Sequence, residues 1–128
     1  MKIYSKNAPN PIGPYSQAIK KNGFLMISGQ IPIHPILNTI PKKISNQTNL
    51  ILKNIEIILK KAKFKIKDII KTTIFTTNLN KINNINYEYE KFFINKKIFI
   101  FPARSCVEVS KLPKNVKIEI EAIAYKKK

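Results

Sequence analysis

The segment that most constrains this fold is a run in which apolar or β-branched side chains occupy both alternating sets of positions. It covers residues 69–77 and reads IIKTTIFTT. β-Branched residues favour strands, and successive side chains of a strand point to opposite faces of a sheet. One set is Ile70, Thr72, Ile74 and Thr76, and the other is Ile69, Thr73, Phe75 and Thr77. Because a strand without a polar face is usually buried on both sides, this pattern predicts that both faces of the sheet are covered.

Two amphipathic helices are predicted, one before this strand and one after it. Apolar residues recur at helical spacing from about 46 to 62, and Ser45 or Asn46 is the expected N-terminal cap. A second helix follows, with Asn80 near its start. The two buried faces are expected to contain Ile51, Ile55, Ile58, Leu59 and Ala62 in the first helix, and Ile82, Ile85, Tyr89, Phe92 and Phe93 in the second.

A β-hairpin is predicted near the N-terminus. Asn22 and Gly23 lie between two apolar runs, and this pair supplies the two positive-φ positions of a tight type I′ turn. The proline-rich segments on either side, residues 7–14 and 30–44, are expected to be loops, because each Pro fixes φ and lacks an amide donor.

Two more strands are expected at the C-terminus, at about 103–109 and 116–125, separated by the turn-like sequence SKLPKN. The predicted order is β-β-α-β-α-β-β, an α+β fold in which two helices cover one face of a mixed sheet. A chain of 128 residues fits one domain, 1–128. Nothing in the chain covers the second sheet face, so we expect an oligomer.

The positive charge of the chain is almost entirely Lys. The net charge is +17, and of the 24 Lys and Arg residues only Arg104 is Arg. A basic protein often binds nucleic acid or an anionic membrane. However, Lys, Ile and Asn make up almost half of the chain, which is typical of an AT-rich gene, and the Lys residues are spread along its whole length. We therefore favour a solvated basic surface over a selected nucleic-acid footprint.

The sequence favours a protein of the cytoplasm. One Cys cannot form an internal disulfide and suits a reducing compartment. No apolar run approaches the ~20 residues that span a bilayer. The N-terminal segment has no apolar signal-peptide core.

Arg104 is the strongest candidate for a functional residue. A guanidinium can form two parallel hydrogen bonds with a carboxylate or phosphate, which a Lys ammonium cannot. Arg104, Cys106 and Glu108 share one face of their predicted strand, and Glu119 and Glu121 share one face of the last strand. If these strands are neighbours, the guanidinium is within reach of the carboxylates. The residues leave two alternatives open: an anion-binding site, or a structural ion pair of Arg104 with Glu119 or Glu121.

Other candidates are weaker. Cys106 has no reason to meet His34, the only His, so a small buried apolar role is expected rather than that of a nucleophile. No cluster has metal-ligand spacing, and a chain with three Gly has no glycine-rich phosphate loop. Tyr15 in the hairpin region serves either packing or a site.

Four motifs together resemble the RidA family, also called YjgF/YER057c/UK114. They are IGPYSQA at 12–18, SGQIP at 28–32, KTTIFTTNLN at 71–80 and FPARSCVEVSKLPKNVKIEIEAIAY at 101–125. The resemblance runs from residue 7 to 125, and the Pro-Ala-Arg-Ser segment and the Glu-rich last strand are its most specific parts.

The resemblance implies a chorismate-mutase-like fold, a homotrimer with clefts between subunits, and 2-iminobutanoate/2-iminopropanoate deaminase activity. Such enzymes hydrolyse 2-imino acids, formed from enamines such as 2-aminoacrylate that PLP-dependent dehydratases release, to 2-keto acids and ammonia. The resemblance implies no cofactor. We expect no membrane partner, because no apolar run could span a bilayer, and the spread of the Lys residues disfavours a nucleic-acid partner.

The same resemblance implies roles for individual residues. Arg104 would bind the substrate carboxylate, and Glu119 would activate the attacking water and remain ionised beside Arg104. The backbone of Cys106 would meet the imine. The remaining residues implied to line the pocket are Tyr15, Ser28 and Asn86.

The chain departs from the family at two positions. Lys63 and Asn38 stand where Gly is common, and a left-handed Lys would cost about 1 kcal/mol. Two other functions remain alternatives: a basic RNA-binding or endoribonuclease-like protein, or a ligand sensor or holdase without turnover. Steep salt dependence would mark RNA binding.

Overall fold

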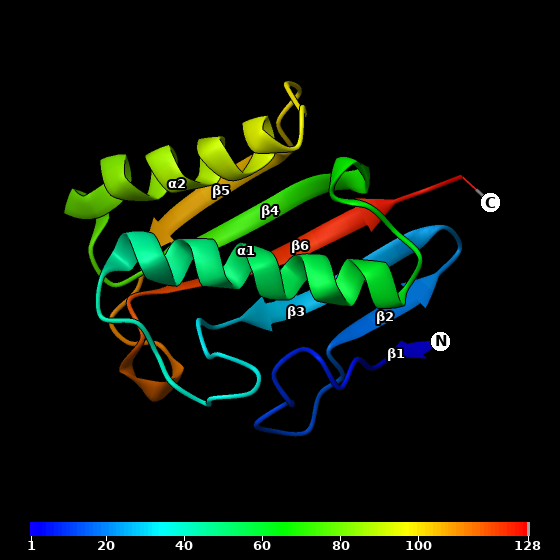
Figure 1. The fold of residues 1–128 in the computed structure, drawn as a ribbon, viewed down its shortest axis with the longest axis horizontal. Coiled ribbons are helices and arrows are strands. Elements are labelled where there is room, and N and C mark those ends of the chain that lie inside the picture. Colours follow the sequence, from blue (N-terminus) through cyan, green and yellow to red (C-terminus); the bar gives the residue numbers. More distant parts are fainter. Residues whose placement is uncertain (128) are drawn as a thin grey trace.

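A computed structural model describes residues 1–127 and contains one six-stranded sheet with both α-helices on the same face (Figure 1). The strands are β1 (Lys2–Ile3), β2 (Ala18–Lys21), β3 (Phe24–Gln30), β4 (Ile69–Thr76), β5 (Ala103–Glu108) and β6 (Ile118–Tyr125). The helices are α1 (Ile44–Lys61) and α2 (Ile82–Asn95), with short 3₁₀ turns at Ile66–Asp68, Leu79–Lys81 and Pro113–Asn115.

The strand order across the sheet is β1-β2-β3-β6-β4-β5. β4 and β5 are parallel, and every other pair is antiparallel. The predicted α+β class, the mixed sheet and the two helices are therefore confirmed. The predicted element order omitted only β1, whose two residues carry too little pattern to be recognised.

The predicted hairpin is confirmed. Asn22 and Gly23 join β2 to β3 with φ values of 52° and 86°, the left-handed conformation that a two-residue type I′ turn requires. The hairpin sets the register of β2 against β3, which places Ala18, Leu25 and Ile27 in the core.

The predicted cap of the first helix is wrong. α1 begins at Ile44 rather than 46, its N-cap is Lys43 in extended conformation, and no side chain caps it. Ser45 and Asn46 lie within the first turn. Burial of Ile44, which is 7% exposed, accounts for the earlier start, because the first turn packs its apolar residue into the core.

The predicted helix faces are confirmed except at two positions. Ile82 is only partly buried, and Ala62, although buried, is the C-cap that follows α1. α1 contributes the buried residues Ile51, Leu52, Ile55, Ile58 and Leu59 to the core. α2 contributes the buried residues Ile85, Tyr89, Phe92 and Phe93. They pack against the sheet residues Leu25, Ile27, Ile74, Ile118 and Ile120. No helix within residues 1–127 is long and apolar enough to cross a membrane.

The central strand β4 contains an irregularity that the alternation did not predict. Its register against β6 shifts between Ile69 and Lys71. As a result Ile69 is buried on the helix side, as Thr72 is, whereas Ile70 is 46% exposed. A β-bulge interrupts the alternation of side chains along a strand. Ile69 therefore lies on the same face as Thr72, where the sequence pattern had placed Ile70.

The sheet face opposite the helices is uncovered in the single chain and exposes many apolar side chains beside the charged Lys71, Glu119 and Glu121. It carries five large apolar side chains that are 41–49% exposed: Ile19, Phe24, Met26, Val107 and Tyr125. Two of them, Phe24 and Tyr125, stack with ring centroids 4.9 Å apart. This open face is the one for which the sequence predicts a covering subunit; the oligomer itself stays a prediction.

Lys63 directly follows Ala62, the C-cap of α1, and has a left-handed conformation with φ of 65°. Its amide donates to Lys60 O, and the next amide, that of Phe64, donates back to Leu59 O. This is the turn in which Gly is favoured, because a Cβ strains the backbone there. Asn38, with φ of 58°, adopts the same conformation at lower cost, since Asn tolerates it better than Lys.

We therefore expect Lys63→Gly to raise the free energy of unfolding by about 1 kcal/mol in urea denaturation. The matched control is Lys61→Gly in the last turn of α1, which should lower it by about 0.5–1 kcal/mol, since Gly is unfavourable inside a helix. Equal destabilisation by both substitutions would contradict this account of Lys63.

Candidate functional site: an arginine half and a glutamate half

Arg104 lies on the helix-covered side of β5, where an aromatic ring supports it. Its guanidinium carbon is 5.2 Å from the ring centroid of Tyr89 on α2, within cation–π distance. The Tyr89 hydroxyl is in turn hydrogen-bonded to Thr72 Oγ1 on β4 at 2.7 Å. The guanidinium is therefore positioned by a buried ring that is itself fixed to the sheet.

A cavity of about 310 Å³ opens beside this guanidinium. It is lined by Asn86, Tyr89, Glu90, Phe101, Pro102 and Arg104. The predicted pocket residues Asn86 and Arg104 thus share one cavity, although they come from a helix and a strand. Arg104 is half-buried and makes no ion pair with any residue from 1 to 127, so its hydrogen-bonding fork is available to a ligand.

Burial raises the pKa of two groups near Arg104, the Tyr89 phenol and the Cys106 thiol. It raises the pKa of the Tyr89 phenol, an effect only partly offset by the Thr72 hydrogen bond and by the Arg104 charge. It also raises the pKa of the Cys106 thiol, again with Arg104 acting in the opposite direction. Cys106 packs against the core, as expected for a small apolar side chain, and stays a thiol at neutral pH.

Arg104 and Glu119 do not lie on neighbouring strands, contrary to the expectation from the sequence. β4 lies between β5 and β6. Arg104 is in register with Thr72, and Glu119 is in register with Phe75. Since Thr72 and Phe75 are three residues apart on one strand, their side chains point to opposite faces. Arg104 and Glu119 therefore project from opposite faces of the sheet.

The alternative of a structural ion pair between Arg104 and Glu119 or Glu121 is also wrong for the single chain. Over residues 1–127 the one ion pair joins Lys96 Nζ to Glu56 Oε2, at 2.7 Å, and it is on the surface. Glu119 is half-buried on the open face. Burial, and then the charge of Glu121, raise the pKa of its carboxyl, the reverse of the expected effect of an adjacent Arg.

Gly29 makes room for the Glu119 carboxylate, and the sequence analysis did not single it out. A Cβ at this position would be 2.7 Å from Glu119 Oε2 and 2.9 Å from its Cδ. Any larger residue would therefore displace the carboxylate. The available signal was that Gly29 is one of only three Gly and lies inside the SGQ motif.

Tyr15 and Ser28 belong to the same side as Glu119. Tyr15 and Gly29 line one small pocket, and the Tyr15 hydroxyl accepts a hydrogen bond from Ile12 N at 3.2 Å. The Ser28 hydroxyl donates to Ser16 O at 2.6 Å, so it joins β3 to the loop that carries Tyr15.

Buried Gln17 orders this loop. Its side-chain amide donates to Ser5 O and Pro9 O, and its carbonyl accepts from Ser5 N. These bonds satisfy a fully buried polar side chain and fix the proline-rich segment that precedes it.

The candidate residues thus form two separate groups. The arginine half comprises Asn86, Tyr89, Arg104 and Cys106, and the glutamate half comprises Tyr15, Ser28, Gly29 and Glu119. The structure brings together the members of each half but not the two halves, which face away from each other in one chain.

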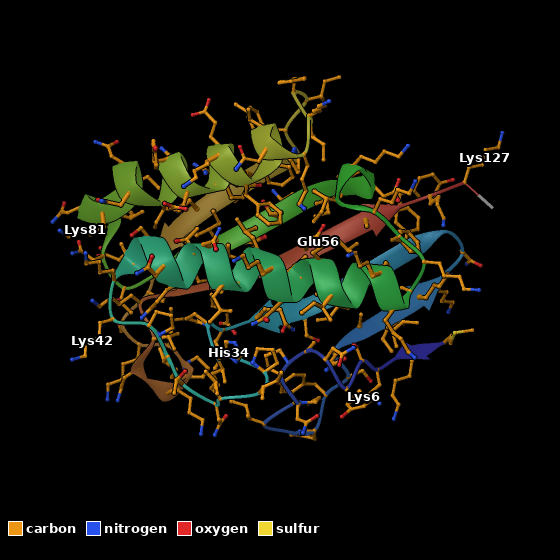
Figure 2. All side chains as sticks on the ribbon, viewed as in Figure 1. Lys6, His34, Lys42, Glu56, Lys81 and Lys127 are labelled. Carbon is orange, nitrogen blue, oxygen red and sulfur yellow. The ribbon has the colours of Figure 1, made fainter. Side chains whose placement is uncertain are left out.

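The remaining polar candidates have local roles or none. His34 Nδ1 accepts hydrogen bonds from the amides of Ile36 and Leu37, which closes a turn of the 31–43 loop. No group of three His, Cys, Asp or Glu residues in the described chain could hold a metal ion. The labelled lysines in Figure 2, Lys6, Lys42, Lys81 and Lys127, lie at separate edges of the molecule rather than along one stripe.

Sequence and structure comparisons agree on the relatives of this chain. The model of a family described as Endoribonuclease L-PSP matches residues 5–126. A RutC family protein of Buchnera aphidicola is 65% identical over 125 residues, covering 98% of this chain and 97% of the relative. The Escherichia coli protein named 2-iminobutanoate/2-iminopropanoate deaminase is 45% identical over 125 residues, with the same two coverages.

Solved structures show the same fold. The E. coli YjgF gene product has a TM-score of 0.96 at 43% identity, with 99% of each chain covered. E. coli TdcF, solved with bound serine, has a TM-score of 0.95 at 42% identity, with 98% of each chain covered. The chain therefore belongs to the RidA (YjgF) family that its motifs predict, the family also described as endoribonuclease L-PSP.

Proposed function

We propose that this protein hydrolyses small 2-imino acids to 2-keto acids and ammonia, at sites where the arginine half of one subunit meets the glutamate half of another. The observation that carries the proposal is the placement of Arg104 and Glu119 on opposite sheet faces, each among the other residues that the family motifs imply for the pocket. Each half is incomplete alone, and a second copy of the chain supplies what the first lacks.

The proposed assembly is a homotrimer. A contact between two unlike surfaces repeats around a ring until the ring closes, so that every subunit uses its arginine half once and its glutamate half once. The exposed apolar side chains of the open face give such an assembly its driving force, because burial of apolar area is the main favourable term in association. No membrane or nucleic-acid partner is needed for this activity.

Arg104 would bind the substrate carboxylate through two parallel hydrogen bonds, which fixes the position of the adjacent imine carbon. A cavity of about 310 Å³ suits a small acid, and Asn86 offers an amide at its edge. Two relatives support this substrate class: one is named for two short imino acids, and the structure of another contains serine, a small carboxylate.

Glu119 would act as the general base. It takes a proton from water as the water oxygen bonds to the imine carbon, and passes that proton to the imine nitrogen to give a carbinolamine. It then takes the hydroxyl proton as the C=O bond forms and gives it to the nitrogen as the carbon–nitrogen bond breaks. The products are a 2-keto acid and ammonia, and water is the only co-substrate, so no cofactor is required. One carboxyl can serve all of these proton transfers, because it accepts a proton as a base and returns it as an acid.

The neutral thiol of Cys106 has no covalent role in this scheme. Its backbone, on the same strand as Arg104, would meet the imine end of the substrate instead. Tyr15 would cover the bound acid, and Ser28 would line the pocket beside Glu119. This arrangement relies on orientation and on preorganised polar groups, and it forms no enzyme–substrate bond.

The second candidate function is RNA binding or cleavage, which the family description and the net charge of +17 favour. Binding that comes from charge alone would weaken steeply with salt and would not depend on Arg104 in particular. Cleavage of RNA that disappears in an Arg104 variant would instead support a nuclease.

Arg104→Lys should lower kcat/KM for imine hydrolysis by roughly ten- to a hundredfold. The Lys ammonium can form only one of the two charge-assisted hydrogen bonds that the guanidinium forms with the carboxylate. Loss of the other bond costs about 1.5–3 kcal/mol. The assay couples the protein to a serine dehydratase and follows formation of the keto acid. A variant as active as the parent protein would exclude the carboxylate-binding role.

Gly29→Ala should lower kcat by tenfold or more without a change in melting temperature. The added methyl moves the Glu119 carboxylate, the far end of a flexible side chain, and leaves the backbone unstrained. Gly13→Ala is the matched control: its Cβ would meet the ring of Tyr15 at 3.5 Å, an ordinary contact that requires no displacement. Equal loss of activity in both variants would count against a specific effect on Glu119.

The pH profile of kcat/KM should report the carboxyl of Glu119. Activity is lost as the pH falls and this carboxyl becomes protonated. Burial and the charge of Glu121 raise its pKa in the single chain, and the partner subunit's Arg104 would lower it in the assembled site. Glu121→Gln removes a nearby negative charge that raises this pKa, so the acid limb should move to lower pH. Glu56→Gln, on the far side of the sheet, should leave the limb unchanged. An acid limb that stays in place in Glu121→Gln would contradict the assignment.

A further inference from the structure

A second and larger cavity, of about 1090 Å³, lies at the end of the molecule where α1 finishes and the loop before β5 begins. Its floor consists of the buried residues Leu59, Phe64, Ile66 and Ile69. Its volume is at the upper end of the range of small-molecule sites, about 300–1000 Å³. It is far too large for a short imino acid, and the proposed deaminase function makes no use of it.

One wall of this cavity is an apolar loop that the fold leaves uncovered. Residues 98–101 read IFIF, and Phe99 and Ile100 are 70% and 91% exposed. Phe101 is anchored at the base of the loop by an edge-on contact with buried Phe93, with centroids 5.9 Å apart. The loop is thus held at its base and presents free apolar side chains beside the cavity.

The rim of the cavity is strongly basic. Its charged lining residues are Lys60, Lys65, Lys67, Lys96, Lys97 and one carboxylate, Glu56. Glu56 already pairs with Lys96 at 2.7 Å. None of the other four lysines forms an ion pair with a residue of the described chain. An apolar floor surrounded by four free ammonium groups complements a molecule with an apolar body and an anionic head.

We propose that this cavity binds an alkyl carboxylate of long chain length as a free monomer. The alkyl chain would lie on the apolar floor against the 98–101 loop, and the carboxylate would lie among the rim lysines. A concave site favours a monomer over a bilayer, because a flat lipid surface cannot fill it. The site is separate from the arginine half, with which it shares only the wall formed by Phe101 and Pro102. The proposal therefore does not depend on the deaminase function.

The test is calorimetric titration of the whole protein with dodecanoate and with dodecyltrimethylammonium, each below its micelle concentration. The two probes share a twelve-carbon chain and differ in the sign of the head group. We expect dodecanoate to bind at least tenfold more tightly, and its affinity to fall as salt is added. Equal affinities, or no binding of either probe, would overturn the proposal.

Two double variants test the two parts of the site. Lys65→Glu/Lys67→Glu and Phe99→Ser/Ile100→Ser should each weaken dodecanoate binding by tenfold or more. The matched controls lie in the 31–43 loop, away from the cavity: Lys42→Glu/Lys43→Glu reverses two exposed charges, and Ile36→Ser/Leu37→Ser replaces two side chains that are 84% and 67% exposed. Both controls should bind within twofold of the parent protein.

Two other results would point to a different occupant and overturn the proposal. In the first, the protein binds phosphatidylglycerol vesicles, this binding is lost in Phe99→Ser/Ile100→Ser, and dodecanoate monomers do not bind. That result would indicate a membrane contact. The second is a change of oligomeric state in Phe99→Ser/Ile100→Ser by light scattering, which would indicate that the loop packs against another subunit. Unaltered melting temperatures exclude misfolding as the cause of weaker binding.

Discussion

The position of β4 between β5 and β6 is the constraint on which the rest of the account depends. It separates the single guanidinium of the chain from Glu119 by one strand and sends the two side chains to opposite faces. One face of this strand lies on the helix-covered core beside Arg104, and the other lies on the open face that carries Glu119. Folding thus produces two half-sites and the apolar face that would join them. In an isolated chain the two halves face away from each other and cannot contact the same small molecule.

Much of the fold could be predicted from local patterns. Asn22 and Gly23 indicated the hairpin because few residues accept two consecutive positive φ values, and helical spacing indicated both amphipathic helices. Local sequence does not encode which strands become neighbours, so the adjacency of the Arg104 and Glu119 strands was predicted wrongly. The bulge at Ile69–Lys71 and the two-residue β1 are fixed by tertiary packing and leave no periodic signal. The helix start was misjudged for a related reason: burial of Ile44 outweighed the absence of a capping side chain.

The candidate site was predictable to the extent that it depends on residue type. Arg104 stood out because the chain uses Lys for every other positive charge. The guanidinium lies over the Tyr89 ring, and Arg104 lines a small cavity; an ammonium lacks the planar fork of a guanidinium. Gly29 was missed because its importance lies in the side chain it lacks, which becomes visible only when the Glu119 carboxylate is placed beside it. The supporting pair Tyr89 and Thr72 was read as core, which it also is.

The central claim is that one working site needs two subunits, and a subunit-mixing experiment tests it most directly. Arg104→Ala and Glu119→Ala proteins, each inactive alone, are unfolded together, refolded as a mixture and assayed for imine hydrolysis. In a ring of unlike contacts, about a quarter of the interfaces would pair an intact Arg104 with an intact Glu119, so about a quarter of the activity should return. If mixed oligomers form and the mixture remains as inactive as its components, the two residues do not act across a subunit boundary.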